Sequence, residues 1–173
     1  PESTLATGSG SATSTFFNNG PITKDKVENI TFLPTLDPVE DAIGYWDASS
    51  NKDGTVIASY KDSDDNGLYE LYIGGVGEVY APKNSSALFG YFTSLKEISF
   101  GNYFNTSNAN LMYAMFYNCS SLSKLDLSKF NISNVTMLGN SEWNNGMFYN
   151  CSKLTTLNVS NWDTSNVTEF RNL

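Results

Sequence analysis

The spacing of apolar positions changes twice along the chain, which divides it into three parts. The first twenty residues are rich in Ser, Thr and Gly and show no apolar period. From residue 21 short alternating runs predict strands, and from about residue 91 one apolar pattern recurs three times. We therefore predict a flexible or extended lead-in (1–20), a small β-rich N-terminal capping domain (21–90), and a solenoid of about three coils (91–173).

The predicted cap consists of strands and one helix. Asp37 and Pro38, followed by acidic residues, are typical of a helix start, and Gly44 would end that helix. Turn signals such as Asp-Asp-Asn-Gly and Gly-Gly separate β-prone runs, which predicts a meander. The predicted elements are a strand over 27–33, a helix over 37–43, and strands over 55–61, 68–73 and 76–80.

Each repeat carries the apolar pattern LxxLxL. The copies cover residues 94–100, 121–127 and 153–159. This spacing predicts a short strand whose last two apolar residues point inward, while the residue between them points outward. An aromatic residue and a polar turn follow each strand, so the aromatics are expected to stack from coil to coil.

Two stretches after these turns are compatible with short helices on the convex side. They cover residues 111–116 and 147–151, and an insertion at 139–146 lengthens the second copy. The predicted fold class is therefore α+β: a β-rich cap followed by a leucine-rich-repeat-like solenoid with one strand and one short helix per coil.

The repeats resemble a known family. Residues 125–130, 133–136 and 147–152 resemble the BspA-like leucine-rich-repeat surface proteins, and residues 157–168 are closer still to the LDLSNFDTSNVT unit of that family. Residues 45–47, 51–54, 68–75 and 84–89 are similar to the segment that precedes the repeats there. The resemblance implies display on the bacterial cell surface and adhesion to host proteins or other bacteria, without a catalytic site.

Composition narrows the choice of partners. The formal charge is −8 and the pI is near 4.3, so nucleic acid and anionic membranes would be repelled. The chain has no histidine, which disfavours an enzyme. No apolar run is long enough to cross a bilayer. Because the chain starts at Pro1 and ends inside a repeat, we expect a processed or truncated product whose open last coil could self-associate.

The best candidate for binding is the outward face of the predicted repeat strands. Such extended faces are what solenoids use to bind other proteins, although a merely solvated sheet would show the same pattern. Trp143, in the insertion, is a second candidate, because it either projects as a contact residue or packs back onto the coils. The outward residues are Glu97, Ser99, Lys124, Asp126, Thr156 and Asn158.

The turn at residues 62–67 resembles half of a calcium loop. Asp62, Asp64 and Asn66 alternate before Gly67, as in the first half of an EF-hand loop. The position where that loop needs a bidentate Glu holds Ile73. The sequence is therefore compatible with a calcium site or with an acidic hairpin turn; no other cofactor is expected.

Cys119 and Cys151 occupy equivalent places in successive copies. Stacked coils would bring them within reach of a disulfide, but buried free thiols pack equally well. Both states are compatible with the sequence.

Two functions follow from these patterns. The first is a non-catalytic, extracellular protein of the bacterial cell surface that binds a host or bacterial surface protein. The second is a structural subunit of an extracellular filament or pilus, in which the lead-in and the open last coil contact neighbouring subunits.

Overall fold

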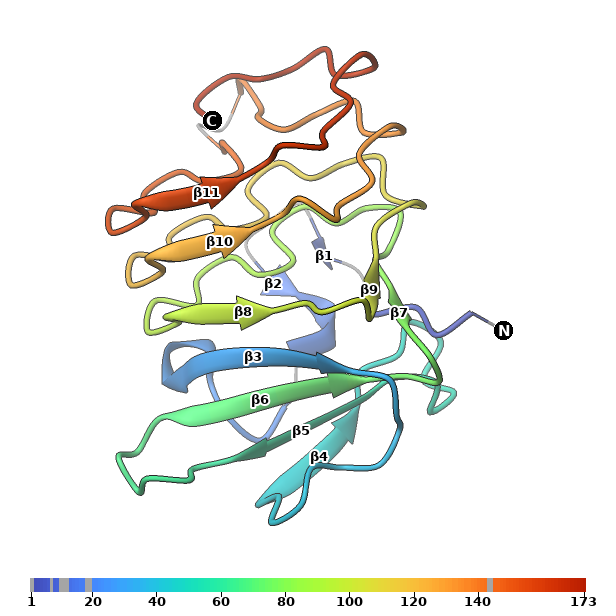
Figure 1. The fold of residues 1–173 in the computed structure, drawn as a ribbon, viewed down its shortest axis with the longest axis vertical. Coiled ribbons are helices and arrows are strands. Elements are labelled where there is room, and N and C mark those ends of the chain that lie inside the picture. Colours follow the sequence, from blue (N-terminus) through green and yellow to red (C-terminus); the bar gives the residue numbers. More distant parts are fainter. Residues whose placement is uncertain (1, 7, 10–12, 18–19, 143–144) are drawn as a thin grey trace.

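The computed structural model describes residues 2–6, 8–9, 13–17, 20–142 and 145–173 and is nearly all β (Figure 1). Two three-residue 3-10 helices, η1 (Thr15–Phe17) and η2 (Lys24–Lys26), are the only helices within this part of the chain. The strands are β1 (Gly8–Ser9), β2 (Thr13–Ser14), β3 (Val27–Leu33), β4 (Gly44–Asp47), β5 (Ile57–Lys61), β6 (Tyr69–Gly74), β7 (Val79–Tyr80), β8 (Glu97–Ser99), β9 (Phe104–Asn105), β10 (Lys124–Asp126) and β11 (Thr156–Asn158).

The largest sheet is mixed and has the order β4-β5-β6-β3-β8. The β4, β5 and β6 strands pair antiparallel, whereas β3 pairs parallel with both β6 and β8. The first repeat strand therefore continues the sheet of the preceding segment. A separate parallel pair, β10-β11, lies beyond β8 along the long axis (Figure 1), while β7-β9 and β1-β2 form two further small sheets.

The predicted strand over 27–33 is confirmed by β3, but the predicted helix over 37–43 is wrong. Backbone N–H groups of this stretch donate to β5, including that of Ile43, which a helix would direct to the Val39 carbonyl. The Val39 N–H donates to Ser59 Oγ at 3.0 Å and the Ile43 N–H donates to the Tyr60 carbonyl at 2.8 Å. The sheet edge thus overrides the local helix signal.

The predicted α+β fold with a helix in every coil is also wrong, because the described residues contain no α-helix. The stretch 111–116 shows why. The N–H groups of Met112, Ala114 and Phe116 donate to the carbonyls of Met137, Asn145 and Met147 in the next turn of the chain. Backbone groups that are bonded to a neighbouring segment cannot also form the i→i−4 bonds of a helix.

Equivalent segments of the repeats lie above one another. Leu125 in β10 pairs with Leu157 in β11, and single parallel bridges join Asn84, Leu111, Met137 and Glu169 in sequence. The ring of Phe116 stacks between Phe89 (5.7 Å) and Phe148 (5.9 Å), with interplanar angles of 19° and 6°. Burying such side chains stabilises the fold by about 1.5–3 kcal/mol each, so these aromatic columns are a main source of its stability.

Part of the N-terminal segment contributes to the same core. Leu5, Phe16 and Phe17 are buried. The Leu5 N–H donates to the Tyr80 carbonyl at 3.0 Å and the Ala6 N–H donates to the Ala48 carbonyl at 2.9 Å. These contacts tie the beginning of the chain to the segments around β4 and β7.

Candidate binding surface

The strand register places polar side chains in two rows on one face of the large sheet. Asn29 on β3 is the pairing partner of both Glu70 on β6 and Glu97 on β8. Thr31 is likewise the partner of Tyr72 and Ser99. Because side chains two residues apart share a face, these six residues lie on the side opposite the buried Ile30, Leu71 and Ile98. We call this side, together with its continuation over β10 and β11, the outer sheet face.

The six residues enclose a shallow hollow in the outer sheet face. Its volume is about 180 Å³, and Ile30 forms part of its lining together with Asn29, Thr31, Glu70, Tyr72, Glu97 and Ser99. Beside it, Lys61 Nζ lies 5.7 Å from the centroid of the Tyr72 ring, within the range of a cation–π contact. The hollow therefore combines carboxylates, an amide, hydroxyl groups and an aromatic ring next to an ammonium group.

The outer sheet face continues over β10 and β11, which lie beyond β8 (Figure 1). Lys124 pairs with Thr156 and Asp126 pairs with Asn158, and all four side chains are exposed. Hydrogen bonds from Ser128 lower the pKa of Asp126, whose Oδ1 accepts the Ser128 N–H at 3.0 Å. The carboxylate is therefore charged at neutral pH and held by the adjacent turn.

The structure thus brings together the six outward repeat residues predicted from the sequence, in the order of their strands. Trp143 lies outside the described residues. Sequence reasoning missed Asn29, Thr31, Glu70 and Tyr72, which extend the surface. The alternation in residues 68–73 indicates one buried and one wetter face for β6, but the parallel pairing of β3 with β6 and β8 arises only from the tertiary fold.

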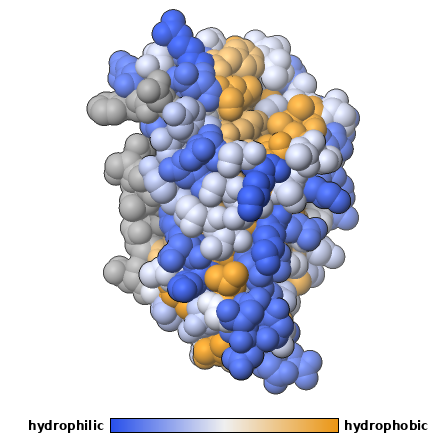
Figure 2. Space-filling view, turned by 90° about the vertical axis from the view of Figure 1, so that its left-hand side faces the viewer, coloured by the Kyte–Doolittle hydropathy of each residue, from blue (hydrophilic) through white to orange (hydrophobic). Residues whose placement is uncertain are grey.

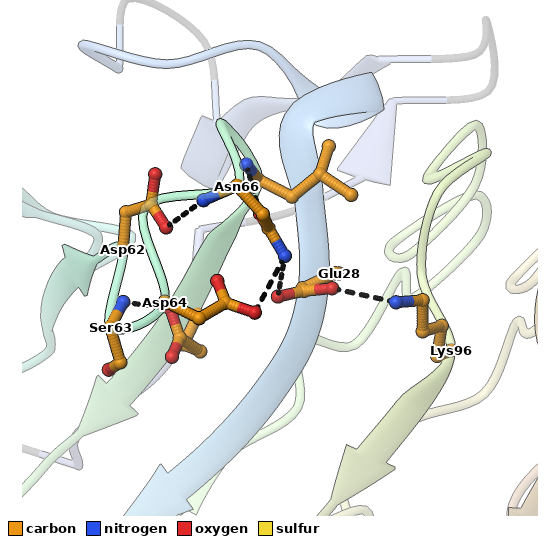
Figure 3. Close-up of polar contacts among 8 residues, drawn as sticks. Glu28, Asp62, Ser63, Asp64, Asn66 and Lys96 are labelled. Carbon is orange, nitrogen blue, oxygen red and sulfur yellow. Dashed lines mark hydrogen bonds and ion pairs between the residues drawn. The ribbon is translucent and has the colours of Figure 1, made fainter.

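The turn at 62–67 uses its acidic oxygens in hydrogen bonds within the protein (Figure 3). Asp62 accepts the N–H groups of Asn66 (3.1 Å) and Gly67 (2.9 Å), and Asp64 accepts the Asn66 side-chain amide at 2.9 Å. The same amide donates to Glu28 Oε1 at 3.3 Å. Among the described residues, no group of three or more acidic, Cys or His side chains is placed so that it could hold a metal ion.

Cys119 and Cys151 are free thiols. Each thiol donates to a main-chain carbonyl of the preceding coil: Cys119 to Phe89 at 3.0 Å and Cys151 to Phe116 at 3.1 Å. Burial raises the pKa of the Cys119 thiol far above its usual range and raises the pKa of Cys151 to about 11. Both side chains are therefore protonated, weakly reactive packing groups.

More than half of the chain matches the model of a protein family. The model described as "Mycoplasma protein of unknown function, DUF285" matches residues 83–173, slightly more than half of the sequence. The chain belongs to this family. The matched DUF285 region begins just before the first repeat and contains β8, β10 and β11.

The DUF285 match corrects the resemblance drawn from the repeats. The matching family is not the BspA-like leucine-rich-repeat family, so that assignment is wrong. Nothing among the curated proteins or the solved structures matches the chain. In the described part of this DUF285 protein, no helix has the length and apolarity needed to span a membrane.

Proposed function

We propose that this protein is a non-catalytic binding module on the outside of a bacterial cell, and that its outer sheet face contacts a surface protein of a host or of another bacterium. The observation that carries the proposal is the array of half-buried and exposed polar side chains on the outer sheet face, which are in register across β6, β3 and β8 and again between β10 and β11. An ordered array of this kind can match a partner at many points while its own strands stay fixed.

The shape of the outer sheet face favours a protein over a small molecule. Pockets for small ligands usually enclose about 300–1,000 Å³ and are mainly apolar, whereas the hollow here measures about 180 Å³ and is mainly polar. Carboxylates at Glu70, Glu97 and Asp126 lie on the same face as the ammonium groups of Lys61 and Lys124. Mixed charge on an open surface supports selective recognition of a partner with complementary charges.

Binding of fluorescently labelled protein to cultured epithelial cells and to bacterial cells, measured by flow cytometry, tests the proposal. We expect saturable binding that disappears after the target cells are treated with trypsin. Asp126→Lys should weaken it about tenfold or more, because it reverses an exposed charge on the face. Antibody labelling of intact producing cells tests the location.

Asp163→Lys is a matched control for Asp126→Lys. Both carboxylates are exposed, and each accepts a backbone N–H two residues later at 3.0 Å, from Ser165 and Ser128 respectively. Asp163, however, lies in the turn after β11 and not on the outer sheet face. Equal losses in the two variants, or binding that survives trypsin, would contradict a protein partner on this face.

A second candidate function is a structural subunit of an extracellular filament, and one observation favours it. The last coil leaves four large apolar side chains 36–45% exposed, namely Leu157, Val159, Phe170 and Leu173. If these contact a second copy, electron microscopy of the purified chain should show regular fibres, and Phe170→Asp should abolish them. Dispersed particles at all concentrations tested would reject this candidate.

A further inference from the structure

A column of tyrosines lies where the turns lead into the repeat strands. Tyr91, Tyr117 and Tyr149 occupy the same place in three successive coils, and neighbouring ring centroids are 5.3 and 5.1 Å apart. Tyr117 and Tyr149 are stacked at 11°. Tyr91 is 38% and Tyr149 42% exposed, so the column borders solvent at both ends.

Hydrogen bonds between coils fix this column. The Tyr91 N–H donates to the Tyr117 carbonyl at 2.7 Å, and the Asn118 N–H donates to the Tyr149 carbonyl at 2.9 Å. Next to the rings, the side-chain amide of Asn150 donates to Asn118 Oδ1 at 2.9 Å. A short row of two amides therefore accompanies Tyr117 and Tyr149, on backbone that is held in place by the bonds between coils.

The phenol groups of the column can form hydrogen bonds and are uncharged near neutral pH. Burial, followed by the neighbouring phenols of Tyr91 and Tyr149, raises the pKa of Tyr117 above its usual value. A neutral phenol both donates and accepts hydrogen bonds, so the column offers neutral polar groups alongside aromatic surface.

The segments that carry the column contain no charged residue, although 16% of the whole chain is charged. They cover residues 84–95, 111–123 and 145–152. Figure 2 views the side of the molecule on which β8, β10 and β11 begin, and shows pale residues of intermediate hydropathy along its middle, between blue ones. One charge from outside these segments lies beside Tyr91, because Lys24 Nζ donates to the Gly90 carbonyl at 3.2 Å. A ligand that contacts Tyr117 and Tyr149 needs neither positive nor negative charge.

We propose that the tyrosine column and its asparagine row form a binding site for a neutral glycan chain. Sugar rings present C–H groups that attract the negative face of an aromatic ring, and Tyr149 has an exposed ring to receive them. Sugar hydroxyl groups match the phenols and the amides of Asn118 and Asn150. The site is separate from the outer sheet face, so it adds a second class of ligand to the proposed function.

Affinity electrophoresis in native gels tests this proposal. The probes are three neutral polysaccharides, namely dextran, mannan and hydroxyethyl cellulose. Alginate, a charged polysaccharide, and a proline-rich peptide are tested as alternative ligands. We expect at least one neutral polysaccharide to retard the protein. Tyr149→Ala should weaken that binding about tenfold, and Tyr149→Phe, which keeps the ring, should weaken it less.

Tyr45→Ala is the matched control, because Tyr45 lies at the other end of the sheet on β4 and is 66% exposed. Circular dichroism melting checks that all variants fold. The proposal is overturned if none of the three neutral polysaccharides retards the protein, if Tyr45→Ala has the same effect as Tyr149→Ala, or if only alginate or the peptide binds.

Discussion

The buried carboxylate of Glu28 and the ammonium group of Lys96 form an ion pair, with Oε2 and Nζ 2.8 Å apart. The Lys96 backbone N–H also donates to the Glu28 carbonyl at 2.8 Å. The second carboxylate oxygen accepts the side-chain amide of Asn66 at 3.3 Å. One side chain on β3 thus joins the β5–β6 turn to the start of the first repeat (Figure 3).

Glu28→Ala should lower the free energy of unfolding by about 1–2 kcal/mol, because it removes the acceptor that the Lys96 ammonium group and the Asn66 amide share. Urea denaturation followed by circular dichroism measures the change. Glu97→Ala, an exposed residue on the adjacent β8, is the control and should cost no more than about 0.5 kcal/mol. Similar losses in both variants would show that the Glu28 contacts are unimportant.

The same ion pair predicts a pH dependence at high pH. Hydrogen bonding and charge attraction from Glu28 raise the pKa of Lys96 above its ordinary value of 10.5. A raised pKa means that the stabilisation is fully present below pH 10.5 and is lost as the pH rises above that value. The difference in melting temperature between the natural protein and Lys96→Met should therefore shrink in strongly alkaline buffer. A constant difference would contradict the pairing.

The two cysteines should behave as protected free thiols. At mildly alkaline pH, iodoacetamide should label Cys119 very slowly and Cys151 slowly in the native protein, because burial raises the pKa of both thiols. After unfolding without a reductant, mass spectrometry should find two labels. Finding none, with two appearing only after reduction, would show a disulfide between Cys119 and Cys151.

Calcium should leave the stability of the protein unchanged. The oxygens of Asp62 and Asp64 accept hydrogen bonds from within their own turn, and a cation would have to replace those donors. Differential scanning calorimetry with millimolar calcium chloride and with a chelator measures the effect. A clear rise in melting temperature that Asp62→Asn removes would instead establish a calcium site.

The strands could be predicted from the sequence because they depend on local alternation. Val27–Leu33 matches its prediction fully. Ile98 in β8 and Leu125 in β10 are buried as LxxLxL predicts, whereas Leu157 in β11 is 39% exposed. The predicted helices do not form. Residues 37–43 and 111–116 have helix-compatible sequences, but their backbone groups bond to distant segments. Local propensity contains no information about those partners.

Only part of the binding surface could be predicted, because a local pattern does not show which strands pair. Ser99, Asp126 and Asn158 follow from the repeat period, whereas Thr31 and Tyr72 join them through strand pairing across a long stretch of sequence. The tyrosine column was hidden because Tyr91, Tyr117 and Tyr149 precede the leucine pattern. A tyrosine four or five residues before the first leucine of each LxxLxL unit was the signal that could have revealed it.

The most direct test of the proposed function is site-specific photocrosslinking on intact target cells. A benzophenone amino acid is placed either at Ser99, on the outer sheet face, or at Ser165, in the exposed turn after β11. The account predicts a discrete, trypsin-sensitive crosslinked product from Ser99 that Asp126→Lys abolishes, and none from Ser165. Crosslinking from Ser165 alone, or equally from both positions, would contradict binding through the outer sheet face.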